Sequence, residues 1–286
     1  MKVAVIVNTL KKEAVNFLPK VINKLLSLNI TPTLLTNTKA FYNSSKIIYY
    51  NNHSELLKNC DIIITIGGDG TIIHMARHAA EYNKPLLGIN FGRVGFVATM
   101  EPNEIDKLSL LLTGEYTCQQ RMLLKVTVEN SDSTKYLYAI NDAVISRGSL
   151  SRMMDLSVMV NGEKICDYRA DGIIFSTPTG STAYSLSAGG PVISPDMECI
   201  LLTPICPHSL FSRSVIFKKD DILTVQVASG RYSDLKSFLT VDGQYDLPIN
   251  ENTKVKIEKY EKSFTLISMK PKNFYTVLND KLNERG

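Results

Sequence analysis

Five consecutive residues, Gly67-Gly68-Asp69-Gly70-Thr71, have the composition of a phosphate-binding turn. They follow the apolar run 61–66 and precede a helical pattern over 71–82, so they stand at the carboxyl end of a strand, where open α/β sheets bind ligands. Glycines let backbone N–H groups approach a phosphate, and the helix N-terminus adds partial positive charge. Two standard loops are excluded, because the lysine of a Walker A loop is absent and Ile73 stands where a dinucleotide fingerprint needs its third glycine.

Asp69 is the informative residue of this turn. A carboxylate inside an anion-binding turn repels phosphate, so phosphate binding alone does not account for it. It suits a general base or orienting group for a hydroxyl nucleophile, or a Mg²⁺ ligand; the alternative is a turn-forming Asp with local hydrogen bonds. We predict Asp69 as the catalytic residue and a phosphate or ATP loop made of Gly67, Gly68, Gly70 and Thr71.

A second glycine-rich turn follows the next buried strand. It spans 88–96, ends at Phe96, and contains Arg93 as a cation available to anions. The parallel strands of one sheet would bring this turn to the same edge as the first. The alternative is a plain loop, with Phe96 in the core.

Two further motifs lie in the second half of the chain. Asn141-Asp142 ends a strand, and an amide followed by a carboxylate can bind a base edge and a ribose diol; the alternative is a strand-end turn. The run 168–191 has seven Ser or Thr hydroxyls within 176–187, which predicts a dense donor surface for a polyhydroxyl or phosphate ligand, the alternative being a Ser/Thr-rich loop. A serine hydrolase is excluded because GxSxG and SxxK are both absent.

Other candidates have simpler interpretations. His74 and His78 have i, i+4 spacing but no glutamate for a metalloprotease base, so no zinc site is expected. Asp242-Gly243 predicts a hairpin turn, and Lys11-Lys12 is expected at the surface.

Hydrophobic patterns predict the elements that position these motifs. Buried strands are expected over 2–7, 30–35, 61–66 and 85–89, with helices between them, so residues 1–120 form a Rossmann-like α/β domain. Pro19 is expected in the first turn of the helix that covers 15–26. From Arg121 onward short strands follow one another, and Asn161-Gly162 marks a two-residue hairpin. Residues 121–270 are therefore expected to be antiparallel and β-rich, with a C-terminal helix in 271–286 that packs back on the first domain.

Composition excludes several classes of protein. The chain has 286 residues, 44% hydrophobic and 21% charged, which suits a globular protein of about two domains. A net charge of +4 suits an anionic small molecule and is too weak for nucleic acid. No apolar run has the length of a membrane span or of a signal-peptide core, and the five separated cysteines suit reduced thiols in the cytoplasm.

Taken together, these motifs resemble the bacterial NAD kinase family. The resemblance rests on residues 67–71, on Asn141-Asp142, and above all on the runs 171–185 and 189–191, in the same order over about 2–280. It implies an ATP:NAD 2′-phosphotransferase that makes NADP, with NAD between the two domains, a divalent metal such as Mg²⁺ with ATP, and a homotetramer or homodimer. Neither a nucleic acid nor a membrane partner is implied, and polyphosphate stays open as the donor.

The resemblance also implies roles for individual residues. Asp69 matches the family's catalytic aspartate, Gly70 and Phe96 match positions beside the dinucleotide, and Asn141 with Asp142 matches adenosine-binding positions. Further dinucleotide contacts match Arg169, Asp171, Thr179, Thr182, Ala183, Tyr184 and Ser187. The family pair is usually Asn-Glu, so the shorter Asp142 implies a longer or water-mediated ribose contact.

Two rival functions remain at this stage. Lipid kinases of the diacylglycerol type share the GGDGT turn, but this chain lacks a basic amphipathic surface helix. A non-catalytic NAD(P)-binding regulator would bind the dinucleotide without making NADP.

Overall fold

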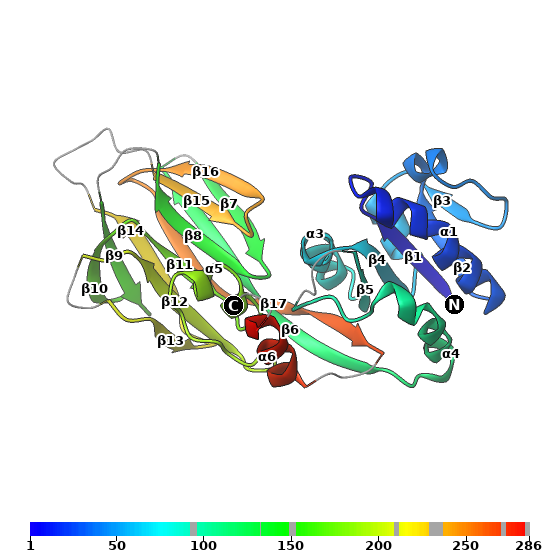
Figure 1. Cartoon of the computed structure of the whole chain (residues 1–286). Coiled ribbons are helices and arrows are strands. Elements are labelled where there is room, and N and C mark those ends of the chain that lie inside the picture. The colour runs from blue at the N-terminus through cyan, green and yellow to red at the C-terminus, as the bar shows by residue number, and fades with distance from the viewer. Residues whose placement is uncertain are drawn as a thin grey trace. The chain divides into compact units, whose positions relative to one another are not determined.

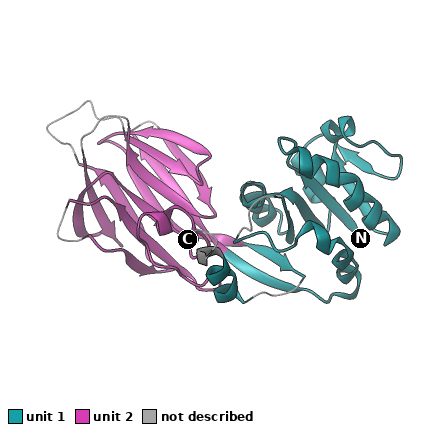
Figure 2. Cartoon of the chain, in the orientation of Figure 1, with its two compact units in different colours: residues 1–121, 264–286 teal, residues 122–263 magenta. Residues whose placement is uncertain are grey.

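The computed structural model describes residues 1–91, 96–131, 133–148, 153–208, 212–228, 237–269 and 273–283. The chain divides into two compact units, shown in Figure 2. Unit 1 comprises Met1–Arg121 and Phe264–Gly286, and unit 2 comprises Met122–Ser263. Strands β6 (Thr117–Asn130) and β17 (Lys254–Ser268) each begin in one unit and end in the other.

Unit 1 is built on a parallel sheet with the strand order β5-β4-β1-β2-β3 (Figure 1). Its strands are β1 (Lys2–Val7), β2 (Thr31–Leu35), β3 (Ile48–Tyr50), β4 (Ile62–Gly67) and β5 (Leu86–Asn90). The end of β17 pairs with β5 in parallel. The strand order reverses between β1 and β4, so the carboxyl ends of these two strands form the topological switch point at which such sheets bind ligands.

Helices connect the strands of unit 1. They are α1 (Lys12–Ser27), α2 (His53–Lys58), α3 (Asp69–Glu81), α4 (Leu110–Thr113) and α6 (Phe274–Asn283), with 3-10 helices η1 (Thr36–Ala40) and η2 (Pro102–Ser109). The expected position of Pro19 is wrong, because it lies in the interior of α1 and not in its first turn. A proline in a helix interior lowers helix stability by about 3 kcal/mol. The helix continues past Pro19 because the neighbouring side chains of Leu18, Val21 and Ile22 are fully buried.

The C-terminal helix α6 belongs to unit 1 and begins at Phe274, inside the predicted range 271–286. The ring centroid of its first residue, Phe274, lies 6.4 Å from that of Phe96. Among the described residues, no helix combines the length and the apolar character needed to cross a membrane.

Unit 2 consists of two antiparallel β-sheet regions. One sheet has the order β13-β12-β11-β8-β15-β16, and the other contains β10-β9-β14 beside the first part of β17, with β6 and β7 paired to each other. The strands not yet given are β7 (Ser133–Ala139), β8 (Asp142–Arg147), β9 (Met154–Val160), β10 (Glu163–Ala170), β11 (Gly172–Ser176), β12 (Cys199–Ile205), β13 (Val215–Lys218), β14 (Leu223–Val227), β15 (Ser237–Val241) and β16 (Tyr245–Ile249).

A single core joins the two sheets of unit 2. Ile145 and Phe175 of the first sheet and Leu156 and Val225 of the second are among its fully or almost fully buried members. The predicted class, an α/β unit followed by an antiparallel β-rich unit, is confirmed.

Two hairpin turns predicted from the sequence are present in unit 2. Asn161 and Gly162 join β9 to β10, both with positive φ, as a type I′ turn requires. Asp242 and Gly243 join β15 to β16 and also have positive φ.

Candidate functional site

The glycine turn lies at the switch point of the unit 1 sheet. All six residues of β4 are buried, and the strand ends at Gly67, from which the chain passes through Gly68 into α3. A Cβ atom on Gly67 would lie 2.2 Å from Thr71 Oγ1, so only glycine fits there. Asn8, which follows β1, donates from Nδ2 to the same Thr71 Oγ1 at 3.3 Å. A hydrogen bond therefore joins the segment that follows β1 to the first turn of α3, which follows β4.

Gly70 differs from Gly67 because packing does not require a glycine there. It is exposed, a Cβ atom would meet nothing within 4 Å, and its φ is not positive. The open space above Gly70 lies over the first turn of α3, where backbone N–H groups have no helical acceptor. A phosphate group can approach the main chain at this position.

Asp69 is held by the loop that follows β5. Its Oδ2 accepts a hydrogen bond from Phe96 N at 2.8 Å, and its Oδ1 accepts one from Ala98 N at 3.0 Å. These bonds cross 27 and 29 residues of sequence, so they are not the local bonds of a turn-forming Asp. Each oxygen keeps a second acceptor position, and the side chain is only partly buried. The carboxylate is thus fixed in orientation and accessible.

Of the second predicted glycine turn, the structure describes residues 88–91 and 96, and Gly88 has a packing role. A Cβ atom on Gly88 would lie 2.3 Å from Ile72 Cδ1, so this glycine allows α3 to lie closely on β5. Arg93 lies outside the described residues. Phe96 contributes its backbone N–H to Asp69 and its ring to the contact with Phe274.

Lys11 is a residue whose position the sequence did not reveal. Lys12 is exposed, as expected, but Lys11 is partly buried. Its Nζ donates to Phe91 O at 2.6 Å and lies 3.3 Å from the position that a Cβ atom on Gly68 would occupy. A fixed cation therefore lies beside the glycine turn.

In unit 2, the turn before β8 is packed against the hydroxyl-rich run. Thr177 N donates to Asn141 O at 2.9 Å, and Thr177 Oγ1 donates to Ile140 O at 2.6 Å. A Cβ atom on Gly180 would lie 2.1 Å from Asn141 O. The structure therefore brings together two motifs, Asn141-Asp142 and Thr179–Thr182, that are about 40 residues apart in the sequence.

Asp242 holds the same turn from another side. Its carboxylate accepts hydrogen bonds from the backbone N–H groups of Ile140 (3.0 Å), Asn141 (2.8 Å) and Asp142 (3.2 Å). The hairpin prediction for Asp242 is correct, but its second role as the anchor of Asn141 depends on a partner 101 residues away.

Asp142 itself lies in an unusual environment for a carboxylate. Only 6% of the residue is exposed. Burial, together with the charge of Asp242, raises the pKa of Asp142 from 3.8 to about 7. At neutral pH the group is divided between acid and carboxylate, so it can donate as well as accept a hydrogen bond.

This pKa shift predicts a pH-dependent stability. The folded pKa lies above the unfolded one, so the contribution of Asp142 is complete below pH 3.8 and is lost as the pH rises towards 7. Asp142→Asn should raise Tm relative to the wild type at pH 8, by about 2–4 °C per kcal/mol relieved, with a smaller gain at pH 5. Thermal unfolding at both pH values measures this, with exposed Asp246→Asn as the control. A gain that is equal at both pH values contradicts the assignment.

The predicted donor surface of hydroxyls is wrong. Of the seven Ser and Thr residues in 176–187, all except Ser187 are buried. Ser181 Oγ bonds to Ile193, Thr182 Oγ1 donates to Thr179 O, and Ser185 Oγ pairs with Thr203 Oγ1. These hydroxyls form hydrogen bonds inside the protein. The exposed side chains of the run are those of Tyr184 and Ser187, and Ala183 is partly exposed.

The remaining predicted residues are Arg169, near the end of β10, and Asp171, between β10 and β11. Arg147 donates to both carboxylate oxygens of Asp171, from Nε at 2.7 Å and from one Nη at 3.2 Å, so Asp171 already has a cationic partner that the sequence did not indicate. This hydrogen bond is also the main reason that the pKa of Arg147 is raised. Arg169 is exposed, and its carbonyl accepts from His208 N at 2.7 Å.

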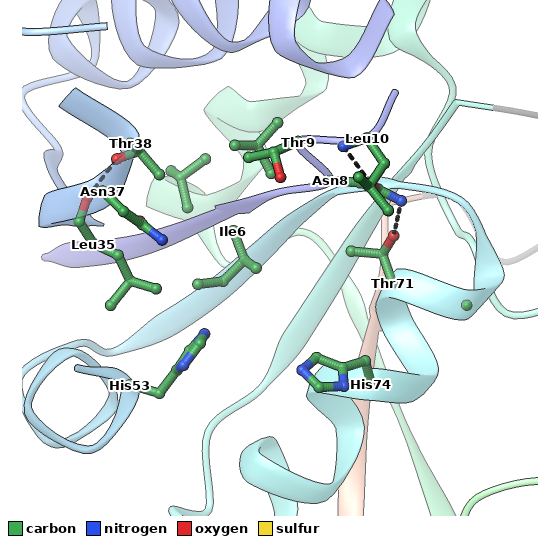
Figure 3. A pocket seen from close by; sticks show the side chains of 13 residues that line it. Ile6, Asn8, Thr9, Leu10, Leu35, Asn37, Thr38, His53, Thr71 and His74 are labelled. Carbon is green, nitrogen blue, oxygen red and sulfur yellow. Dashed lines mark hydrogen bonds between the residues drawn. The ribbon is translucent and has the colours of Figure 1, made fainter. Parts of the chain in front are cut away.

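A pocket opens beside the glycine turn within unit 1 (Figure 3). Its volume is about 440 Å³, which is in the range for a small-molecule site. It is lined by residues of β1 and the loop after it, of the end of β2 and η1, of α2, and of the first two turns of α3: Val5, Ile6, Val7, Asn8, Thr9, Leu10, Leu35, Asn37, Thr38, His53, Gly70, Thr71 and His74.

A parallel sheet with a glycine turn and a fixed carboxylate at its switch point is the architecture of a nucleotide-binding phosphotransferase. Comparison with known families gives a narrower result. The family models "ATP-NAD kinase N-terminal domain" and "ATP-NAD kinase C-terminal domain" match residues 3–116 and 140–269. The chain belongs to the NAD kinase family.

Individual relatives agree with this assignment. The chain is 38% identical to an NAD kinase of Thermoanaerobacter sp. (strain X514), over 99% of both chains, and 37% identical to one of Clostridium beijerinckii, over 94% of both. An NAD kinase from Archaeoglobus fulgidus, solved in complex with ATP, has 26% identity and a TM-score of 0.73 over 100% of both chains. Yeast NADH kinase complexed with NADH has a similar fold, with a TM-score of 0.86 at 24% identity over 99% of this chain and 87% of the yeast chain.

Proposed function

We propose that this chain transfers the γ-phosphoryl group of ATP to the 2′-hydroxyl of the adenosine ribose of NAD, and that Asp69 holds the attacking hydroxyl. The observation that carries the proposal is the orientation of the Asp69 carboxylate by two backbone N–H groups at the switch point, next to the open main chain of Gly70. Phosphoryl transfer requires an in-line nucleophile, a positioned donor and neutralised charge more than covalent help.

In this reaction the 2′-oxygen forms a bond to the γ-phosphorus while the bond from that phosphorus to the β,γ-bridging oxygen breaks. ADP leaves with the electrons of the broken bond. The proton of the 2′-hydroxyl passes to a free acceptor position of Asp69. The main-chain N–H groups at the start of α3 face the charge that develops on the phosphate oxygens.

The site is compatible with a divalent metal that arrives with ATP. Mg²⁺ is usually bound by one or two carboxylates together with substrate phosphates. Within the described residues there is no cluster of three or more His, Cys, Asp or Glu side chains that could hold a metal alone, whereas Asp69 has acceptor positions to spare. When bound there with ATP, Mg²⁺ would offset the charge of the transferring phosphate.

For NAD we propose the residues of unit 2. Asn141 and Asp142 would bind the adenosine, and their position is supported by the anchor that Asp242 provides. Arg169, Asp171, Thr179, Thr182, Ala183, Tyr184 and Ser187 are proposed as further contacts, of which Arg169, Tyr184 and Ser187 are exposed. Gly70 and Phe96 of unit 1 are proposed beside the dinucleotide.

We also propose that the enzyme acts in the cytoplasm as a homodimer or homotetramer. All five cysteines are free thiols, which suits a reducing compartment. Light scattering on the purified protein tests the oligomer, since it separates the mass of one 31.9 kDa chain from two or four.

Lys11 is proposed to neutralise the donor's phosphates from beside the glycine turn. Losing one charged hydrogen bond costs about 1.5–3 kcal/mol, so Lys11→Ala should raise KM for ATP about 10- to 100-fold with KM for NAD little changed. The neighbouring Lys12→Ala is the control, because Lys12 is exposed. Equal rises in both KM values would mean that Lys11 has only a structural role through Phe91.

The activity is tested by an enzyme-coupled NADP assay with NAD and Mg-ATP. NADP formation supports the proposal. Tight binding of NAD without NADP formation would indicate a non-catalytic regulator, and phosphorylation of diacylglycerol in place of NAD would indicate a lipid kinase.

A further inference from the structure

Asp142 is a nearly buried carboxyl group on the outer face of a sheet of unit 2. It is the first residue of β8, and the alternate residues Ala143 and Ile145 belong to the core between the two sheets. Because successive side chains of a strand point to opposite faces, Asp142 lies on the face that is turned away from that core. Only 6% of the residue is nevertheless exposed. Its burial therefore comes from the residues that cover this outer face.

The hydroxyl groups of the neighbouring strand β11 do not bind the Asp142 carboxyl group (Figure 1). Ser176, its partner in register, donates to Thr177 O at 2.7 Å, and Thr177 Oγ1 donates to Ile140 O. The backbone N–H of Asp142 donates to Asp242, but among the described residues no group donates to the carboxyl oxygens of Asp142. Because buried polar groups are normally hydrogen-bonded, this carboxyl group indicates the place of a ligand that carries a donor.

The charge that faces Asp142 is a second carboxylate. Asp242, in the turn between β15 and β16, accepts three backbone N–H groups, and such bonds favour the ionised form of a carboxyl group. Of the groups that the structure describes, Asp242 is the only one whose charge shifts the ionisation of Asp142, since Ser176 on the other side is uncharged. Burial and this charge raise the pKa of Asp142 to about 7. The proton of the carboxyl pair therefore resides on Asp142.

The adenosine ribose of NAD carries the donors that Asp142 lacks. A ribose diol has two O–H groups, and an ionised carboxyl group accepts with both of its oxygens, whereas the protonated group has an O–H of its own to place. A ligand that donates to the group therefore favours its ionised form and binds that form more tightly.

We propose that Asp142 releases its proton when the adenosine ribose of NAD binds, which makes the binding of NAD dependent on pH near neutrality. The O–H bond of the carboxyl group breaks, the proton passes to the solvent, and a ribose hydroxyl donates to the carboxylate that remains. The inference rests on the proposed function, which places the adenosine at Asn141 and Asp142, and it adds a control of that site by pH. NAD binding weakens as the pH falls below neutrality.

Calorimetric titration of the whole protein with NAD at pH 6 and pH 8 tests the inference. With a pKa of about 7, the ionised fraction of Asp142 rises about tenfold between these pH values, so the Kd of NAD should fall about tenfold. A Kd that is equal at both pH values, or that rises with pH, overturns the proposal.

Two variants separate Asp142 from other titrating groups. In Asp142→Asn the Kd should change by less than about twofold between pH 6 and pH 8, which also excludes a contribution of the four histidines, since histidine titrates in this range. Asp246→Asn removes an exposed carboxylate of unit 2 and should keep the pH dependence of the wild type. A pH dependence that Asp142→Asn retains contradicts the assignment.

The released proton can also be counted at pH 7. The apparent enthalpy of NAD binding, measured in two buffers of different ionisation enthalpy, gives the number of protons exchanged with the solvent. The wild type should release about half a proton per NAD bound, because about half of Asp142 is protonated before binding, and Asp142→Asn should release none. Proton uptake by the wild type would mean that Asp142 donates to NAD, contrary to the proposal.

A spectroscopic readout does not depend on turnover. At pH 6, saturating NAD should remove the C=O stretching band of a protonated carboxyl group from the infrared difference spectrum of the wild type, and Asp142→Asn should show no such loss. If the wild type loses this band but makes no NADP, the kinase proposal fails and the inference stands. If the wild type makes NADP but keeps the band, the inference fails alone, and absence of NAD binding contradicts both.

Discussion

Asp69→Asn is expected to lower kcat for NADP formation by about 10²- to 10⁴-fold, the usual contribution of a general base. The Kd of NAD should change little, because the residues proposed to bind NAD are mainly in unit 2. Asparagine has nearly the same shape but cannot take the proton of the 2′-hydroxyl. Single-turnover kinetics with saturating Mg-ATP, together with calorimetric binding of NAD, measure the two quantities separately.

The structure requires a control for stability in this experiment. Each oxygen of Asp69 accepts a hydrogen bond from a backbone N–H group, whereas the side-chain amide of asparagine has only one acceptor oxygen. In Asp69→Asn one backbone N–H therefore loses its acceptor, which lowers the free energy of unfolding by about 1–3 kcal/mol. Asp61→Asn is the matched control. Asp61 directly precedes β4, at the end of the strand opposite to Asp69, and its Oδ2 also accepts a backbone hydrogen bond, from Lys2 N at 2.7 Å. Asp61→Asn should lower Tm slightly and leave kcat unchanged. Near-normal turnover in Asp69→Asn would remove the carboxylate from the mechanism.

Strands β1, β2, β4 and β5 of unit 1 could be predicted because their sequences carry the signal by themselves, whereas β3 was not predicted. A run of apolar residues such as 62–66 has no polar face and must be buried on both sides, which only a covered parallel sheet provides. The N-terminal bound of α1 was misjudged because proline is normally excluded from helix interiors. Core packing of the surrounding residues outweighs that local preference, and packing is not visible in the local sequence.

The strands of unit 2 were harder to predict because their partners are distant. The alternating pattern of residues 255–259 predicts only the first part of β17, which continues through the polar residues 258–263 to Ser268. β8 and β12 were not predicted, although each pairs with β11 in the middle of a sheet. Cross-strand packing and burial, more than intrinsic preference, decide strand formation.

In the candidate site, too, local features could be predicted from the sequence and long-range contacts could not. The GGDGT turn was recognised because its glycines and its place between a strand and a helix are local features. The bonds that orient Asp69, the ion pair of Asp171 with Arg147, and the place of Lys11 depend on contacts across 24 to 80 residues. The hydroxyl-rich run was misread because composition does not tell which hydroxyls face inward. The close packing of Gly180 against Asn141 is likewise visible only in the folded structure.

Gly180→Ala is expected to disrupt the turn of unit 2 that we propose to bind the adenosine. The added Cβ atom would lie 2.1 Å from Asn141 O and 2.6 Å from Asn141 Cα, and both are backbone atoms that no side-chain rotation can move. Asn141 is also held by Thr177 and Asp242, so the strain cannot be relieved at one place. Overpacking of this kind costs about 1–3 kcal/mol and sometimes more. We expect a lower Tm and an increase of at least about tenfold in the Kd of NAD.

Gly70→Ala is the matched comparison, because the two glycines differ in what surrounds them. A Cβ atom on Gly70 meets nothing within 4 Å, and alanine is favoured over glycine in a helix by up to about 1 kcal/mol. This variant should keep or raise Tm and lose turnover, since the added methyl group occupies the space through which a phosphate approaches the main chain. Calorimetric unfolding and NAD titration of both variants separate the two effects. If Gly180→Ala keeps both the Tm and the NAD affinity of the wild type, the turn at Asn141 is not the rigid adenosine site that we propose.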